Sequence, residues 1–323
     1  MSSKILVILL TLSLGCGIVL AQSTSPAPKP ANAAPASTGT PDLPSGGNFR
    51  TRTDEVNVIF TVTDKHGKFV KDLKQNEFKI LDNNLPPKEI KSFEASTNLP
   101  LRVGLLIDAS NSIRDRFLFE QQAAIEFLHQ TIHPQTDKAF VLAFDEVWDV
   151  EQDFTNDLDK LSRGVKAIRP GGGTAMWDAV YYACRDKLMR ERSTGIVRLA
   201  IVLVSDGDDN QSRVLRQEAI EMAQHAGVIV YAISTNLSNI LDTGDHNLKM
   251  LAEATGGRAF FPFKLQNLAE DFHEVQEELR SQYSVNYKPA QFSLNGMYRP
   301  IVITTENKKL KVRAKKGYYV PKE

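Results

Sequence analysis

The 323-residue sequence has little cysteine and no excess of either charge. Only Cys16 and Cys184 are present, which excludes a disulfide framework and a cysteine-rich zinc site. Lysine and arginine number 39, and aspartate and glutamate also number 39, so the formal net charge is zero. Such a charge balance argues against a protein that binds nucleic acid through bulk positive charge, and also against an acidic solvating tail. The hydrophobic content of 42% suffices for a globular core.

Long apolar runs are missing after residues 1–21. This first stretch has one charge, Lys4, then a short apolar run and small residues, which predicts a secretory signal peptide cleaved after Ala21. A membrane anchor is the alternative, but the run is short for a span. Lipid attachment at Cys16 is a further alternative that the sequence leaves open. Cleavage would leave Cys184 without an internal partner. We expect an exported chain, in the periplasm, cell envelope or outside the cell, with no transmembrane segment.

Residues 22–50 are dominated by proline, alanine, serine, threonine and glycine. They contain almost no large apolar side chains, so they cannot bury a core of their own. We therefore expect a disordered linker between the signal peptide and the folded part of the chain.

Two short β segments flank the middle of the chain. In residues 51–98, an alternating strand pattern comes first, and residues 78–81 and 90–93 are typical of two further strands around a turn. Residues 283–323 return to strand patterns. Each segment is too small to be a stable sheet alone. We therefore expect them to pair in a small β-sandwich into which residues 99–282 are inserted.

The inserted region alternates buried apolar runs with amphipathic helical patterns. Fully apolar runs, such as residues 103–107, are typical of strands that are buried on both faces. This order predicts an α/β fold with a doubly wound, mostly parallel sheet. We expect strands at 103–107, 139–144, 147–154, 199–204, 228–234 and 259–263, and helices at 117–132, 175–190, 213–226, 248–255 and 268–279.

Oxygen-bearing side chains gather where the predicted strands end. Asp108, Ser110 and Ser112 follow the first buried strand and alternate, so an extended loop points all three the same way. Thr174 follows three glycines, and Asp206 follows a later buried strand. Because parallel sheets bind ligands at the carboxyl ends of their strands, we expect one site there. Hard oxygen ligands suit Mg²⁺, Mn²⁺ or Ca²⁺. Helix caps and turns are the alternative for any single loop.

These motifs carry a resemblance to a known family. Asp-x-Ser-x-Ser, a threonine in a glycine-rich loop and a later Asp-Gly resemble the metal-ion-dependent adhesion site (MIDAS) of von Willebrand factor type A domains. The order of strands and helices over residues 101–280 agrees with that family. The whole chain further resembles exported bacterial proteins, common in Acidobacteria, that carry a type A domain between β segments. The resemblance implies a Rossmann-like fold.

The resemblance also implies roles for single residues. Ser110, Ser112 and Thr174 match positions that bind the metal directly, while Asp108 and Asp206 match positions that often act through water. In the family, a glutamate or aspartate of a partner protein completes the metal's coordination. Four further residues are expected to support the site or contact the partner: Asn111, Asp178, Asp208 and Asn210.

We therefore expect a binding module for adhesion or assembly that depends on a divalent cation, and not an enzyme. A metal-dependent phosphoester hydrolase is the alternative from another class. We disfavour it because the sequence places no histidine or glutamate beside the motifs. A scaffold with a purely structural metal is a third hypothesis. No nucleic acid is expected as a partner. The sequence does not name the partner, the metal or the oligomeric state.

Other signals have plainer interpretations. His129 and His133 are four residues apart on a helix, but the glutamate of a zinc-protease motif is replaced by Gln130. Cys184 has no partner motif and is more typical of a core filler. The basic residues at 308–316 favour an edge strand protected by lysine, with contact to an anionic envelope polymer as the alternative.

Overall fold

Three β-sheets organise the residues that the structure describes. The predicted signal peptide and linker, with Cys16, lie outside the described residues, and so does Ser112. Among the residues that are described, no helix is long and apolar enough to cross a membrane. The computed structural model describes residues 55–95, 99–111, 117–191, 197–236, 238, 240–262, 264 and 267–320.

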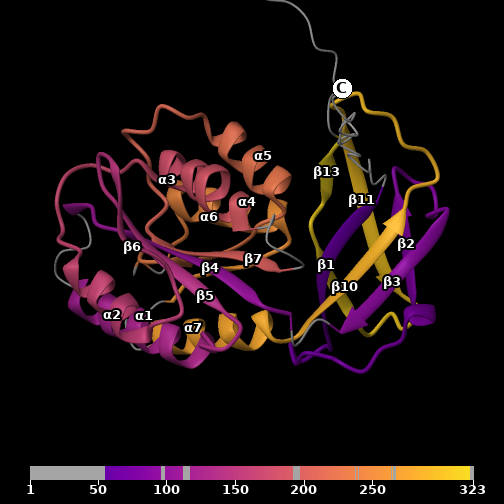
Figure 1. The fold of residues 1–323 in the computed structure, drawn as a ribbon, viewed down its shortest axis with the longest axis horizontal. Helices are drawn as coiled ribbons and strands as arrows, with labels where there is room; N and C mark the ends of the chain where they lie inside the picture. Colours follow the sequence, from indigo (N-terminus) through magenta and orange to yellow (C-terminus); the bar gives the residue numbers. More distant parts are fainter. Residues whose placement is uncertain are drawn as a thin grey trace, which may run out of the picture. The chain divides into compact units, whose positions relative to one another are not determined.

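A six-stranded sheet forms the centre of the inserted domain (Figure 1). Its neighbouring strands run parallel except for the antiparallel pair at the β6 edge. Strands β4 and β7 lie side by side in the middle, and every residue of β7 is buried. In spatial order, the strands are β6 (Trp148–Thr155), β5 (Lys138–Phe144), β4 (Leu101–Asp108), β7 (Arg198–Ser205), β8 (Ile229–Ser234) and β9 (Ala259–Phe260).

Helices cover both faces of this sheet, which confirms the predicted doubly wound fold (Figure 1). The strands alternate between the two cores, so Leu105 and Ile107 pack on one face and Leu106 packs on the other. One face is covered by α1 (Phe117–Thr131), α2 (Leu158–Ala167) and α7 (Asn267–Leu279). The other face is covered by α3 (Met176–Tyr182), a π-helical segment η3 (Ala183–Leu188), α4 (Met189–Glu191), α5 (Arg216–Ala226) and α6 (Thr243–Thr255).

Two antiparallel sheets contain strands from both sides of the inserted domain. In the first, β1 pairs with β10 from Val56–Tyr287 to Thr61–Gln282, so the N-terminal and C-terminal β segments share one sheet. A common apolar core joins this sheet to the second. The first sheet has the order β12 (Lys311–Ala314), β1 (Val56–Thr63), β10 (Gln282–Lys288) and β3 (Glu89–Ala95). The second has the order β13 (Gly317–Tyr319), β11 (Tyr298–Thr305) and β2 (Phe78–Asp82), which the short helix η1 (Gln75–Glu77) precedes.

The turn between β2 and β3 does not make a hairpin, although the sequence suggested a pair of strands around it. Strand β2 pairs with β11, whereas β3 pairs with β10 in the other sheet. Asn83 and Asn84 have positive φ angles of 50° and 65°, and two prolines follow at positions 86 and 87. Proline has no backbone N–H to donate to a ladder. The chain therefore leaves one sheet at this turn and enters the other.

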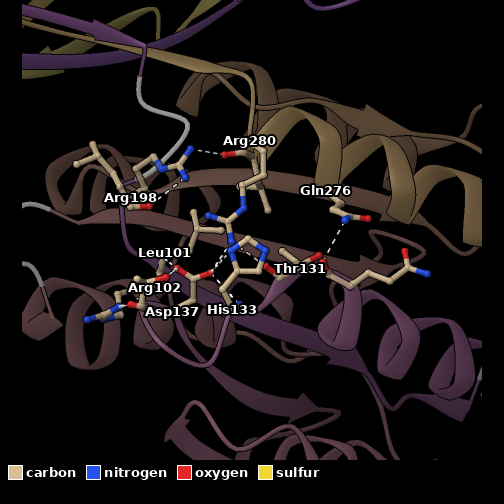
Figure 2. A network of polar contacts seen from close by, with 12 residues as sticks. Leu101, Arg102, Thr131, His133, Asp137, Arg198, Gln276 and Arg280 are labelled. Carbon is tan, nitrogen blue, oxygen red and sulfur yellow. Dashed lines mark hydrogen bonds and ion pairs between the residues drawn. The ribbon is translucent and has the colours of Figure 1, made fainter.

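Buried polar groups hold the two points where the chain passes between the sandwich and the inserted domain (Figure 2). Arg198, only 1% exposed, donates to the carbonyl oxygens of Leu99, at 3.0 Å, and of Leu279. The Asp137 carboxylate accepts from the backbone N–H of Leu101 at 2.8 Å and from the Arg280 guanidinium. Both connecting segments are thus hydrogen bonded to residues at the amino-terminal end of the central sheet.

Candidate metal centre

Three loops meet at the carboxyl ends of β4 and β7, the end of the sheet where the sequence predicted a site. The backbone N–H of Gly171 donates to the carbonyl of Ala109 at 2.6 Å, which joins the glycine loop to the loop after β4. Thr174 and Asn210 exchange two hydrogen bonds of 3.0 Å, one from each backbone N–H. These bonds join the glycine loop to the loop after β7. The structure therefore brings the three predicted motifs together.

Asp108 is the most deeply buried carboxylate of the site, with no exposed surface. One of its oxygens accepts from the Ser110 backbone N–H at 2.8 Å, and the other accepts from the Ser205 hydroxyl at 2.6 Å. Burial, with a smaller contribution from the nearby charge of Asp206, raises the pKa of Asp108 to about 6, against the effect of these hydrogen bonds. A carboxylate held dry beside a second acid favours a bound cation.

The other predicted ligands lie around Asp108 as far as the structure describes them. Ser110 and Thr174 are 3% and 5% exposed. Within the described residues, the Thr174 hydroxyl makes no hydrogen bond. Asp206 is partly buried and accepts from the backbone N–H of Asp208 at 3.2 Å. Ser112, the fifth predicted ligand, lies outside the described residues, so its place in the site stays a prediction.

The four predicted supporting residues divide into two groups. Asp178 and Asn210 hold the loops: Asp178 accepts from the backbone N–H groups of Arg213 and Val214 at 3.0 and 2.8 Å, and Asn210 bonds to the glycine loop as described. Asn111 and Asp208 are exposed at the rim. Asn111 also donates to the Gly172 carbonyl at 3.3 Å.

Three further residues lie at the site. Ser205 binds Asp108, as described, and accepts from the Gly207 N–H at 3.0 Å. Asp209 accepts from the Trp177 N–H at 3.0 Å, so it caps α3. Glu146 follows β5 and packs against Gly172. The expectation that no glutamate lies beside the motifs was therefore wrong, because it considered only residues adjacent in sequence.

The donors at the three loops suit a hard divalent cation. Asp108 and Asp206 supply carboxylates, and Ser110 and Thr174 supply hydroxyls, which is an all-oxygen set with few charges. In the residues that the structure describes, no group of three or more histidine, cysteine, aspartate or glutamate side chains could hold a metal. A site formed by the described residues of these loops would therefore depend on hydroxyl ligands as well as carboxylates.

Comparison with protein-family models identifies the domain type of the inserted region. A model of the von Willebrand factor type A domain matches residues 103–278, more than half of the chain. A comparison with curated proteins gives no match.

Solved structures share the fold at low sequence identity. A von Willebrand factor type A protein from Catenulispora acidiphila matches with a TM-score of 0.50 and 14% identity, over 77% of this chain and 74% of that one. The proximal thread matrix protein 1 from the mussel byssus, with a zinc-occupied MIDAS motif, has a TM-score of 0.49 and 15% identity, over 61% of this chain and 49% of that one. The von Willebrand domain of a type V pilus tip protein from Porphyromonas gingivalis has a TM-score of 0.46 and 15% identity, over 55% and 94%. This chain spans about half the length of the mussel protein.

Proposed function

The chain belongs to the von Willebrand factor type A family, and from that premise we propose that it is an exported module that binds a protein partner through a divalent cation. The partner would be held in adhesion or assembly at the carboxyl end of the central sheet. Export rests on the predicted signal peptide of residues 1–21.

One observation carries the proposal: a fully buried carboxylate lies at the meeting point of three hydrogen-bonded loops. Among the described residues, the hydrogen-bond donors to Asp108 are uncharged, and a second acid, Asp206, lies nearby. An ionised carboxylate in such a place needs a cation. The Thr174 hydroxyl supports the same conclusion, because no described group bonds to it and the residue as a whole is only 5% exposed.

The metal would be held by Asp108, Ser110, Ser112, Thr174 and Asp206. Two carboxylates would only balance the two positive charges of the ion. An acidic side chain of the partner would therefore be a favourable further ligand. Mg²⁺, Mn²⁺ and Ca²⁺ all suit these oxygen ligands. When bound, the ion supplies an electrophilic point that attracts the partner's carboxylate.

We propose that the site binds without catalysing a reaction. Hydrogen bonds join the backbones of the three loops to one another, and loops fixed in this way suit a rigid docking surface. Two carboxylates beside the glycine loop, Glu146 and Asp145, could act as a base, and Glu146 gives the hydrolase alternative a direct test. Turnover of phosphoesters with Mg²⁺ that is lost in Glu146→Gln would contradict a binding role alone.

A capture experiment tests the proposed function. The purified chain would be used to capture proteins from a cell-envelope extract in Mg²⁺, and capture would be repeated in EDTA. We expect Asp206→Ala to weaken metal binding by about 10- to 100-fold or more, since losing a group that only supports a ligand already costs that much. The same partners should be lost in EDTA and with Asp206→Ala.

The matched control is Asp72→Ala, an exposed aspartate of the sandwich. It should capture the same proteins as the wild type in Mg²⁺. Metal affinity would be measured separately by titration calorimetry. Partners that remain bound in EDTA and to Asp206→Ala would overturn the proposed function.

A further inference from the structure

An apolar groove lies beside the candidate metal centre. It has a volume of about 490 Å³ and is lined by the first turn of α1 and by the segment that leads from α2 to the glycine loop. Its apolar lining consists of Phe117, Leu118, Ile168 and Pro170. Pro170 directly precedes Gly171, whose backbone binds the loop after β4. The groove is therefore continuous with the loops that would hold the metal.

The floor of the groove is part of the domain's core and is held firmly. Phe117 and Ile168 are 4% and 1% exposed, and both belong to the apolar core on that face of the sheet. The Gln121 side chain donates to the carbonyl oxygen of Val165 at 2.6 Å, which ties α1 to the end of α2. A preformed floor of this kind loses little conformational freedom when a ligand enters.

Leu118 stands out at the rim of the groove. Its side chain is 80% exposed, the largest value among the exposed large hydrophobic side chains that the structure describes. The neighbouring Phe119 is 36% exposed. Single exposed apolar residues are common on proteins, but this one lies over an apolar floor and next to a candidate site. Contact with a partner would remove its surface from water.

Two positively charged side chains line the same groove. Lys166 and Arg169 line it and are exposed, and neither forms a salt bridge within the described residues. The Arg169 guanidinium donates to the carbonyls of Lys166 and Ile168 at 2.6 and 2.9 Å, which fixes it at the end of α2. A fixed guanidinium favours a carboxylate partner.

We propose that this groove is the second half of the partner-binding surface, and that it receives a large apolar side chain close in sequence to the carboxylate that completes the metal's coordination. A further acidic residue of the same segment would face Lys166 and Arg169. This inference rests on the proposed function and defines its partner: an acidic segment with an aliphatic or aromatic residue beside the metal-binding acid.

Synthetic peptides test the groove on the full chain. Each labelled 12-residue peptide would carry one central glutamate, a leucine placed one to four residues to either side, and one aspartate beyond the leucine. Matched peptides would replace glutamate with glutamine, leucine with serine, or aspartate with asparagine. Binding would be measured by fluorescence anisotropy in Mg²⁺ and in EDTA.

We expect the best glutamate–leucine peptide to bind in Mg²⁺, and binding to fall at least tenfold with glutamine or EDTA. Serine in place of leucine should weaken it about tenfold. Leu118→Ser should weaken the leucine peptide at least fivefold and leave the serine peptide unchanged, because it alters only a side chain that lies mostly in water. Arg169→Gln should reduce the preference for aspartate over asparagine. The control is Met297→Ser, which replaces a 64% exposed residue of the sandwich.

The outcomes separate the two proposals. Binding that needs Mg²⁺ and glutamate, but is the same with leucine or serine and in Leu118→Ser, overturns the groove and leaves the proposed function standing. Binding through leucine that persists in EDTA would mean that the groove acts without the metal, which overturns the shared surface. No binding by any peptide at millimolar concentration would contradict both proposals.

Discussion

At the scale of single residues, Asp271 of α7 is an acid in an unfavourable place. Its Oδ2 is buried and has no hydrogen-bond partner among the described residues. Burial raises the pKa of Asp271 to about 7, and the charges of Glu274 and Glu270 add to this, while Arg258 lowers it. The folded protein therefore holds this proton more tightly than an unfolded chain, in which aspartate titrates near pH 3.9.

A definite pH dependence follows from this shift. Between about pH 4 and 7 the folded state binds more protons at Asp271 than the unfolded state, so stability falls as pH rises through that window. Asp271→Asn removes the charge, so we expect it to raise the melting temperature by a few degrees at pH 8 and to leave it unchanged at pH 4. Thermal unfolding at both pH values measures the effect. Glu306→Gln, at an exposed position of the sandwich, is the control and should change neither value.

The candidate site shows which residues a sequence can reveal. Asp108, Thr174 and Asp206 each follow a strand or a glycine run directly, so their pattern alone placed them at one end of the sheet. Glu146 also follows a strand, but it joins the site only because β5 lies next to β4. Strand order is a property of the fold, and no local pattern specifies it.

At the scale of elements, the end of α6 touches the sandwich. Gly256 ends this helix with a φ of +87°, and a Cβ atom there would lie 2.5 Å from the backbone nitrogen of Lys315. The same connection includes an ion pair between Lys316 and Glu253, at 3.0 Å, and one between Arg313 and Glu278. Two of the basic side chains at 308–316 therefore bind the inserted domain. Strand β12 lies at the edge of its sheet, as the sequence predicted.

Gly256→Ala and Gly67→Ala form a matched pair. Gly67 also has a positive φ, +84°, but nothing lies within 4 Å of its would-be Cβ. Alanine at Gly67 should cost only the backbone strain, about 1–2 kcal/mol. Alanine at Gly256 should cost about 2–4 kcal/mol, because crowding against Lys315 adds to the strain. Urea unfolding gives both values, and equal losses would show that the contact contributes nothing.

Helix α2 is the element that the sequence prediction missed. Its ten residues include four charged side chains and Gly164, which weakens a helical pattern. The signal was present nonetheless: Leu161 and Val165 are one turn apart, and Asp157 caps the helix by accepting from two backbone N–H groups. Gly164 is required by packing, since a Cβ there would lie 2.7 Å from the Gln152 side chain of β6. Packing against β6 thus explains why glycine occupies position 164, although glycine lowers the helix propensity.

At the scale of the whole molecule, the buried Arg198 links the two parts of the folded chain. Its donors satisfy carbonyl groups on both connecting segments, at Leu99 and Leu279 (Figure 2). Replacing arginine with methionine keeps much of the volume but leaves both carbonyls without these donors. Each buried group left unsatisfied costs about 1–3 kcal/mol.

We therefore expect Arg198→Met to lower the free energy of unfolding by about 2–4 kcal/mol. Chemical unfolding followed by circular dichroism measures this loss. Arg163→Met, at an exposed position on α2, is the control and should change stability by less than about 0.5 kcal/mol. A loss for Arg198→Met no larger than that of the control would mean that water replaces the missing donors.

The pairing of β1 with β10 also sets an order of events during synthesis. A ribosome completes β1, β2 and β3 first, but β10, β11 and β12, with which they pair, come some 200 residues later. Until then, the three early strands have apolar faces and open edges that could join other chains. The inserted domain can begin to fold during this delay. The first strands to leave the ribosome are thus among the last to be covered, and the cell must keep them apart until the chain is finished.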